Sequence, residues 1–419
     1  MRIFLVLFLL FSNCIYSQFI PPTVGVHYKK SSSTSEESFV IDFDNDDDCT
    51  SGCSSSFYAE VPWTTNLSTY TVSLWVKSGE EDPSDWRAFF NTHSPNSGGF
   101  QLDSNGGNRY RFLSTEGSET FGANTIKTTW VHLAAVVNGT DTKLYYNGAY
   151  VATGNWVESD WNGIEIGRNR NADRPGNYYL DEVRVWDAAL SQANIQAWMH
   201  KTLSSSHPNY SDLQVYFQMN SNSISGTTLL DASTNGNNAT MYNSSGINTS
   251  SSYVPVVDLV SNYQNDVESI WTSSGTADSD ASDGLSMNVS STLAEANFAV
   301  FGNNNSSGTT SSNLPSGQSL QKRSSREWQL EESGTVIVNI KIDISDATGN
   351  NITPAAASNY KLLFKSCTEC DFVVNATGSS SSGDIITFSN ISIQDGFYSI
   401  ASTDSNICLL YTSPSPRDS

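Results

Sequence analysis

The sequence has few positive charges for its length. Its 419 residues include 21 Lys and Arg side chains against 43 Asp and Glu side chains, which gives a formal net charge of −22. Proteins that bind nucleic acid or anionic membrane surfaces attract them with basic patches. The charge balance therefore argues against both kinds of partner. The length suggests two domains, each with enough chain to bury a core.

Long apolar runs are also scarce. The run over residues 3–11 is too short to span a bilayer as a helix, and Ser17 provides a small residue at which a signal peptidase could cut. We expect residues 1–17 to be a secretory signal peptide, with lipidation at Cys14 as the alternative. Residues 18–37 are rich in Pro and Ser and are expected to form a linker. No later segment is apolar enough for a transmembrane helix.

Cysteine is rare, and four of the six cysteines form two close pairs. These are Cys49 with Cys53 and Cys367 with Cys370. In an exported chain each pair is most simply a disulfide that closes a short loop. The second spacing also occurs in redox pairs, but the sequence around it alternates like strands rather than βαβ, and a zinc site would need a second pair of ligands.

What the chain has in abundance is period-2 alternation of apolar and polar residues, which is typical of strands with one buried face. The Asn147-Gly148 dipeptide lies between two alternating segments and predicts a tight hairpin. Residues 191–200 are the one helix candidate, opened by Ser191 as a cap. Many short strands with Gly and Asn turns predict an all-β fold built from sandwiches. The predicted strands include 39–43, 57–61, 70–76, 130–137, 143–146, 149–152, 298–305, 326–332 and 336–343.

An ordered series of motifs over the first half resembles the LamG-like jelly-roll domains of the concanavalin A-like superfamily. This resemblance implies a jelly-roll domain over residues 38–250. Residues 255–405 resemble, more loosely, the β-rich modules found beside LamG-like domains in large exported bacterial proteins, and we expect a smaller β-sandwich there. The motifs are Phe43–Asp48, Tyr58–Pro62, Tyr70–Val76, Thr129–Ala135, Lys143–Gly148, Gly163–Gly167, Tyr179–Trp186 and Ala189–Ile195.

Catalytic patterns are absent from the sequence. The superfamily includes glycoside hydrolases, which place carboxylates on one strand as Glu-x-Asp-x-x-Glu, and no such pattern occurs here. Asp181 and Glu182 are adjacent, and adjacent residues of a regular strand face opposite sides. No nucleophile elbow, His-Glu-x-x-His helix or phosphate loop is present. His132 lies in an apolar strand and is expected in the core. We expect no enzyme activity from residues 18–407.

Calcium is the metal that the acidic opening loop suggests. Calcium binds hard oxygen ligands in flexible geometry. The resemblance implies a structural calcium held by one carboxylate of the opening loop and one of the closing strand, which are Asp44 and Asp181 here, with Asp47 as a third ligand. The alternative is a solvated acidic loop, with Asp181 or Glu182 paired to Arg184 or Arg168.

Sugar binding would need exposed aromatic rings flanked by polar side chains. Trp86, Trp156 and Trp161 are expected in loops and are candidates for stacking on a sugar, although each could equally be a packing residue. Arg168 and Arg170 lie in a basic segment that could bind an anionic glycan bidentately, or could be part of a loop balanced by local aspartates.

Residues 408–419 resemble a translated sequencing adapter, so we expect the natural sequence to depart from this one near residue 407. Taken together, the sequence predicts a secreted or cell-surface, non-catalytic protein that binds a glycan or cell-surface polysaccharide, or mediates adhesion. The alternatives are the accessory binding region of a truncated polysaccharide-degrading enzyme, or a spacer without a ligand.

Overall fold

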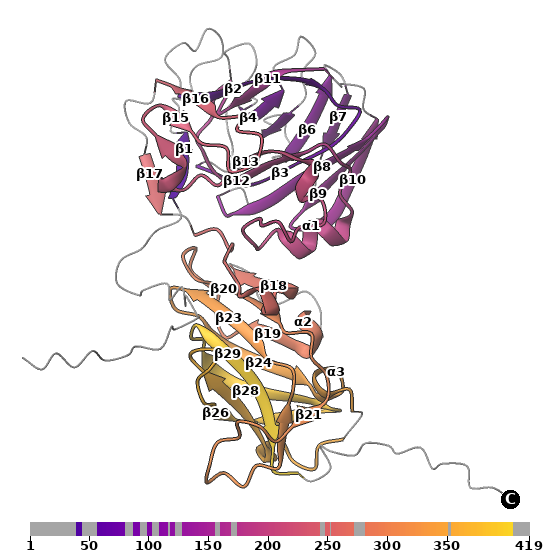
Figure 1. The fold of residues 1–419 in the computed structure, drawn as a ribbon, viewed down its shortest axis with the longest axis vertical. Helices are drawn as coiled ribbons and strands as arrows, with labels where there is room; N and C mark the ends of the chain where they lie inside the picture. The colour runs from indigo at the N-terminus through magenta and orange to yellow at the C-terminus, as the bar shows by residue number, and fades with distance from the viewer. Residues whose placement is uncertain are drawn as a thin grey trace, which may run out of the picture. The chain divides into compact units, whose positions relative to one another are not determined.

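The structure is a computed structural model of the 419-residue chain (Figure 1). It describes residues 39–43, 57–79, 87–92, 99–102, 109–115, 118–121, 128–155, 160–168, 174–243, 248–251, 253–271, 281–350 and 353–404. In these ranges the chain is mostly strand, and four antiparallel sheets form two successive sandwiches.

The first sheet of the N-terminal sandwich has the order β10-β9-β8-β3-β12-β1-β17, and β13 also pairs with β12. Its strands come from both ends of the first half of the chain. β1 pairs with β12 on one side and with the late strand β17 on the other. The strands are β1 (Phe39–Phe43), β3 (Thr69–Ser78), β8 (Val131–Asn138), β9 (Asp141–Tyr146), β10 (Ala149–Asn155), β12 (Tyr178–Trp186), β13 (Leu213–Phe217) and β17 (Asn248–Ser251).

The second sheet of this sandwich has the order β14-β15-β16-β2-β11-β4-β5-β6-β7. β2 lies between β16 and β11, so that residues near 60, 165 and 240 are neighbours. The strands are β2 (Tyr58–Asn66), β4 (Arg87–Thr92), β5 (Gly99–Leu102), β6 (Tyr110–Thr115), β7 (Ser118–Phe121), β11 (Asp160–Ile166), β14 (Ile224–Ser225), β15 (Thr228–Leu229) and β16 (Ala239–Tyr242).

The core of the sandwich lies between these two sheets. Val72 and Leu133 reach it from the first sheet, and Phe90 and Ile164 reach it from the second; all four are fully buried. Alternation explains this arrangement, because every second residue of a strand points to the same face. The predicted jelly-roll sandwich is confirmed.

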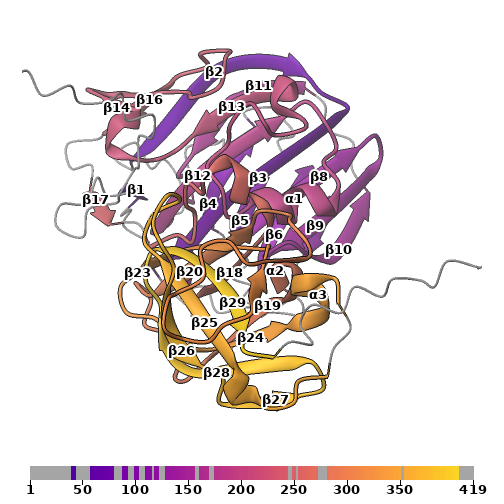
Figure 2. The ribbon, with the colours of Figure 1, turned by 60° about the horizontal axis from the view of Figure 1, so that its bottom comes forward.

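The predicted helix is also present. α1 (Gln192–Trp198) begins at Ser191, whose side chain accepts a hydrogen bond from the backbone N–H of Asn194. Ile195 and Trp198 pack on the outer face of the first sheet, against side chains of β8, β9 and β12. The helix α1 lies beside β8 and β9 in both views (Figures 1 and 2). Outward-facing residues of this sheet are therefore buried as well.

The Asn147-Gly148 turn joins β9 to β10 as predicted. Asn147 has a φ of 47° and Gly148 a φ of 74°, the left-handed pair that a tight hairpin turn requires. The side chain of Asn147 also accepts a hydrogen bond from the backbone N–H of His132, at 2.9 Å.

The C-terminal sandwich has one sheet in the order β18-β20-β23-β29-β22-β21, with β25 on β29 and β26 on β25, and a second in the order β19-β24-β28-β27. Trp328, Ile340, Phe388 and Tyr398 are fully buried between them. The strands are β18 (Asn265–Trp271), β19 (Leu285–Val289), β20 (Phe298–Asn303), β21 (Thr309–Thr310), β22 (Lys322–Ser324), β23 (Trp328–Ser333), β24 (Ile337–Asp343), β25 (Tyr360–Lys365), β26 (Val373–Thr377), β27 (Ser380–Ser382), β28 (Ile385–Ser392) and β29 (Gly396–Ser402).

Short helical segments complete the described part of the chain. α3 (Ile344–Thr348) begins at Asp343, which caps it, whereas α2 (Ala281–Gly284) is a single turn with left-handed residues inside it. The remaining segments are the 3₁₀ turns η1 (Tyr210–Asp212), η2 (Ser221–Ser223), η3 (Ser261–Tyr263) and η4 (Ala357–Asn359). None of the described helices is long and apolar enough to cross a membrane.

The Cys367–Cys370 disulfide is present and closes a short turn after β25, as predicted. Cys49 and Cys53 lie outside the described residues.

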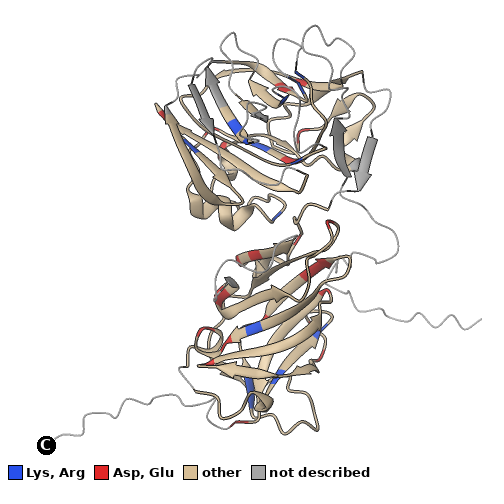
Figure 3. Cartoon of the chain, turned by 180° about the vertical axis from the view of Figure 1, so that it is seen from behind, with Lys and Arg blue, Asp and Glu red and all other residues tan. Residues whose placement is uncertain are grey.

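Several of the few basic residues of the sequence lie on strands (Figure 3). Arg87, Arg111, Arg184 and Arg323 are all buried. These four guanidinium groups are therefore not available to a large anionic partner.

Candidate functional site

Several of the predicted site residues lie outside the described part of the chain. They are Asp44, Asp47, Trp86, Trp156 and Arg170. The structure does describe Trp161, Arg168 and Asp181, and it places them in three different environments.

Trp161 is a core residue, so its prediction as a sugar-stacking side chain is wrong. It is 1% exposed and contacts the rings of Trp63 and Tyr70, with centroid distances of 5.6 and 4.9 Å. From the sequence, Trp161 was expected in a loop. Instead Gly163, with a φ of 115°, lies at an irregularity inside β11, where the pairing with β2 shifts between Asn162 and Ile164.

Arg168 is 7% exposed and does not present its guanidinium to solvent. Its Nη2 donates to Oε1 of Glu165 at 3.1 Å, and its Cζ lies 3.2 Å from the centroid of the Tyr58 ring. The guanidinium is thus already paired with a carboxylate and stacked on an aromatic face. The described carboxylate partner of Arg168 is Glu165, a glutamate rather than one of the local aspartates that were expected. Burial of the guanidinium contradicts bidentate capture of an anionic glycan by this side chain.

Tyr58 carries a second ring on its other side. Tyr242 lies directly opposite Tyr58 in the pairing of β16 with β2, and their rings stack at 4.7 Å with an interplanar angle of 12°. Because Ala59 and Met241 point into the core, Tyr58 and Tyr242 point to the outer face of the sheet. Tyr242 is 40% exposed. We call Arg168, Tyr58 and Tyr242 the aromatic stack.

Polar side chains continue the same face beyond the aromatic stack. Thr240 is opposite Glu60, and Glu60 is opposite Glu165, so these three residues form a row across β16, β2 and β11. Thr240 is exposed and Glu60 is half-buried. Burial raises the pKa of the Tyr58 hydroxyl, an effect that Arg168 opposes, so the phenol stays neutral. An exposed ring beside a carboxylate and a hydroxyl is an arrangement suited to a polyhydroxylated ligand.

The sequence did not identify Tyr58 and Tyr242 as site residues. They are 184 positions apart (242 − 58), and each fits an ordinary alternating strand. The signal was the alternation itself, which predicts an outward ring at both positions but not which strands are neighbours.

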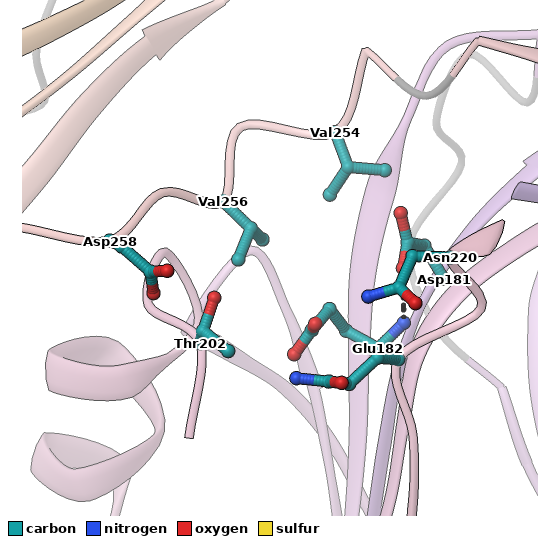
Figure 4. A pocket seen from close by; sticks show the side chains of 8 residues that line it. Asp181, Glu182, Thr202, Asn220, Val254, Val256 and Asp258 are labelled. Atoms are coloured by element: carbon teal, nitrogen blue, oxygen red, sulfur yellow. Dashed lines mark hydrogen bonds between the residues drawn. The ribbon is translucent and has the colours of Figure 1, made fainter. Parts of the chain in front are cut away.

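A separate cavity of about 140 Å³ lies on the outer face of the other sheet (Figure 4). It is polar, and carboxylates come to it from β12 and from the segment that follows β17. Its lining residues are Asp181, Glu182, Thr202, Gln218, Asn220, Val254, Val256 and Asp258. The volume is below the range of about 300–1,000 Å³ that is usual for small-molecule sites.

Asp181 and Glu182 both line this cavity, so the expectation that they face opposite sides is wrong. Glu182 has a φ of 51°, and the pairing of β12 with β3 shifts between Asp181 and Arg184. This β-bulge turns two consecutive side chains to one face, and Val183 then returns to the core.

Glu182 is nevertheless a structural carboxylate rather than a free one. It pairs with Arg184, and both of its oxygens accept from the hydroxyl of Tyr216, at 3.0 and 2.8 Å. Burial raises the pKa of Glu182, and Arg184 and Tyr216 oppose that rise. The predicted alternative, in which Glu182 pairs with Arg184, is confirmed.

Asp181 is 3% exposed, and its Oδ1 accepts the backbone N–H of Glu182 at 2.7 Å. Among the described residues, no three His, Cys, Asp or Glu side chains form a group that could hold a metal ion. The other two carboxylates expected at the calcium site, Asp44 and Asp47, lie outside the described residues.

Two parts of the chain match known protein families. The model of the concanavalin A-like lectin/glucanases superfamily, of laminin G type, matches residues 51–196. The first sandwich is a concanavalin A-like lectin/glucanase domain. Residues 257–397, beyond the concanavalin A-like domain, match the family described as domain of unknown function DUF8202. No catalytic family is identified by these matches. A search of curated proteins finds no match.

Solved structures similar to this chain include a candidate carbohydrate binding protein from Bacteroides ovatus, at 20% identity and a TM-score of 0.42. The match covers 53% of this chain and 62% of the Bacteroides protein. A second is the SAP-like pentraxin of Limulus polyphemus, at 15% identity and a TM-score of 0.31, with 39% of this chain and 83% of the pentraxin covered. A third is domain 4 of the extracellular arabinanase AbnA from Geobacillus stearothermophilus, in complex with arabinotriose, at 25% identity and a TM-score of 0.25, covering 31% and 66%.

Proposed function

We propose that this protein binds a carbohydrate without catalysis, and that Tyr242 in the concanavalin A-like domain is the ring on which a sugar stacks. The observation that carries the proposal is the aromatic stack, in which an outward-facing tyrosine 40% exposed is held against Tyr58 and, beneath it, Arg168.

The stack favours binding because it is already ordered. A side chain that is immobilised only on binding costs about 0.5–1.5 kcal/mol in lost rotamer freedom. Tyr242 is stacked on Tyr58 before any ligand arrives, and Tyr58 is fixed by a guanidinium that is itself bonded to Glu165. A pyranose ring has an apolar face of C–H groups that fits a tyrosine ring, while its hydroxyl groups need polar partners at the edge.

Those polar partners lie along the same face. Thr240 and Glu60 supply a hydroxyl and a carboxylate on the two strands that carry the tyrosines. A carboxylate accepts hydrogen bonds from two vicinal hydroxyls, and a threonine hydroxyl can donate or accept. Together these groups present a ring and hydrogen-bonding atoms on one surface, which supports a carbohydrate ligand.

The experiment is glycan-array screening of the full chain, followed by calorimetry with the best ligand. Tyr242→Ala should weaken binding at least tenfold, because the exposed ring is lost. Tyr150 provides the matched control: it is 49% exposed and lies on β10, in the other sheet. Tyr150→Ala should leave the affinity unchanged. Equal affinity of wild type and Tyr242→Ala would place the site elsewhere.

The proposed cellular role is display outside the cell as a secreted or surface-attached adhesion module. The same binding activity could serve as the targeting arm of a larger polysaccharide-degrading enzyme, and a chain that binds no glycan in the array would be a spacer. Fractionation of the producing cells, with antibody against residues 257–397, would test the proposed location.

A further inference from the structure

A second, much smaller cavity lies beneath α1 and is separate from the aromatic stack. Its volume is about 10 Å³, and its walls come from β3, β8, β12, α1 and the segment that follows α1. A cavity needs roughly 10–15 Å³ of this kind to hold one water molecule. The space therefore suits one water and nothing larger.

Three buried nitrogen atoms belong to side chains that line this cavity. They are Nδ1 of His132, Nε1 of Trp186 and Nε2 of His207, from residues that are 2%, 2% and 3% exposed. None of the three atoms has a hydrogen-bond partner among the described residues. A buried polar group without a partner destabilises the fold, and native proteins rarely leave three such groups at one point.

The donors and acceptors can be assigned from their other contacts. The backbone N–H of Asn209 donates to Nδ1 of His207 at 3.0 Å, so the proton of this neutral imidazole is on Nε2. The indole nitrogen of Trp186 is a donor only. His207 and Trp186 therefore offer two donors to the cavity, and Nδ1 of His132 is left to act as the acceptor.

We propose that one buried water molecule occupies this cavity, accepts hydrogen bonds from Trp186 and His207, and donates one to Nδ1 of His132. Water fits because it accepts two hydrogen bonds and donates two. Ser73 and Asn194 also line the cavity and provide an acceptor for the second proton.

A metal ion does not fit the same groups. An indole N–H cannot ligate a metal, and Nε2 of His207 carries a proton, so one ligand nitrogen remains. Arg184 also lines the cavity, and its bonds to Glu182, to the carbonyl oxygen of Trp198 and to that of Lys201 hold it there as a cation. The site is therefore specific for a small neutral molecule. The water links His132 on β8, Trp186 on β12 and His207 in the segment after α1. Among the described residues, their three buried nitrogen atoms make no direct hydrogen bond to one another.

Nitrogen-15 NMR of the full chain, labelled at histidine and tryptophan, tests the proposal at neutral pH without a substitution. We expect His207 and His132 both as the Nε2–H tautomer, and a cross-peak between the Trp186 indole proton and a long-lived water. His132 as the Nδ1–H tautomer would overturn the proposal, because three donors cannot share the two lone pairs of one water. Absence of the water cross-peak would also overturn it.

A pair of substitutions gives an independent measurement. Trp161 is the matched control for Trp186, because its indole nitrogen is also buried without a described partner but lies among apolar rings in the core. Trp186→Phe removes a hydrogen bond to the water, so its melting temperature should fall several degrees further than that of Trp161→Phe. An equal or smaller fall for Trp186→Phe would contradict the water site.

Discussion

The guanidinium of Arg184 joins the carboxylate of Glu182 to the end of α1. Its Nη1 donates to the carbonyl oxygen of Trp198 at 2.9 Å, and its Nη2 donates to that of Lys201 at 2.7 Å. Arg184 is 2% exposed and Glu182 is 6% exposed. The ion pair on β12 thus fixes the position of the helix on the sheet, since those two carbonyl groups lie at and just beyond the helix C-terminus.

Arg184→Met should therefore destabilise the protein strongly. Removing one partner of a buried ion pair leaves an uncompensated charge and costs about 3–5 kcal/mol. We expect a loss of that size in the free energy of unfolding, measured by urea denaturation. The double variant Glu182→Gln with Arg184→Met should recover part of the loss, because no buried charge remains. A double variant less stable than Arg184→Met would contradict this account.

Acid should weaken the fold through its buried histidines. Burial is the main cause that lowers the pKa of both His200 and His207 to about 4, and Arg184 adds to the effect. Their pKa in the unfolded chain is about 6.5. The neutral form is thus favoured in the folded state, so stability is full above about pH 6.5 and is lost as the pH falls toward 4.

The loss should reach about 1.4 kcal/mol per pH unit for each histidine within that window. Urea denaturation at several pH values between 7 and 4.5 measures it. Carboxylates titrate in the same range, so the decisive quantity is the difference between the wild type and His207→Gln. The unfolding free energy of His207→Gln should change less steeply with pH, by the contribution of one proton. Parallel slopes for the two proteins would show that His207 titrates normally.

The hairpin glycine Gly148 should not tolerate a side chain. An added Cβ would lie 2.7 Å from Cγ of Gln196 on α1, and the φ of 74° is itself unfavourable for alanine. Left-handed backbone costs about 1–2 kcal/mol for a residue with a Cβ. Gly226 has a φ of 63° with nothing within 4 Å of an added Cβ, so Gly226→Ala isolates the backbone cost. Gly148→Ala should lower the melting temperature further than Gly226→Ala does.

Calcium binding at Asp181, with Asp44 and Asp47 from the opening loop, remains our proposal and has a direct test. EDTA should lower the melting temperature of the full chain, and added calcium should restore it. Asp181→Asn should abolish the difference, whereas Asp187→Asn, an exposed carboxylate just after the same strand, should not. Identical melting curves with and without EDTA would refute a structural calcium.

Much of the fold could be predicted from local sequence signals. Ser191 and the apolar residues after it predicted a helix over 191–200, and α1 spans Gln192–Trp198. The Asn147-Gly148 turn was also predicted, because only a few dipeptides readily place two successive residues in the left-handed backbone conformation. These features depend on interactions within a few residues of one another.

The candidate site depends on features that local patterns do not encode. A glutamate with positive φ is rare, and nothing near Glu182 in the sequence marks the bulge that turns it beside Asp181. Trp161 was expected in a loop, but Gly163 lies at a bulge inside β11 and Trp161 is in the core. The Tyr58–Tyr242 contact required the order of strands in the sheet, which is a long-range property.

The strand order of the first sandwich also sets when it can be completed during synthesis. β2 emerges from the ribosome early, but its partner β16 ends at Tyr242, and the partner of β1 ends at Ser251. Translation proceeds at about 5–20 residues per second. The edges of β1 and β2 therefore stay unpaired for roughly ten seconds or more, until β17 and β16 have been synthesised. A nascent chain stopped near residue 196 would have neither β16 nor β17 and would expose two strand edges to other chains. Efficient production of the domain should therefore depend on factors that shield these edges until residue 251 has emerged.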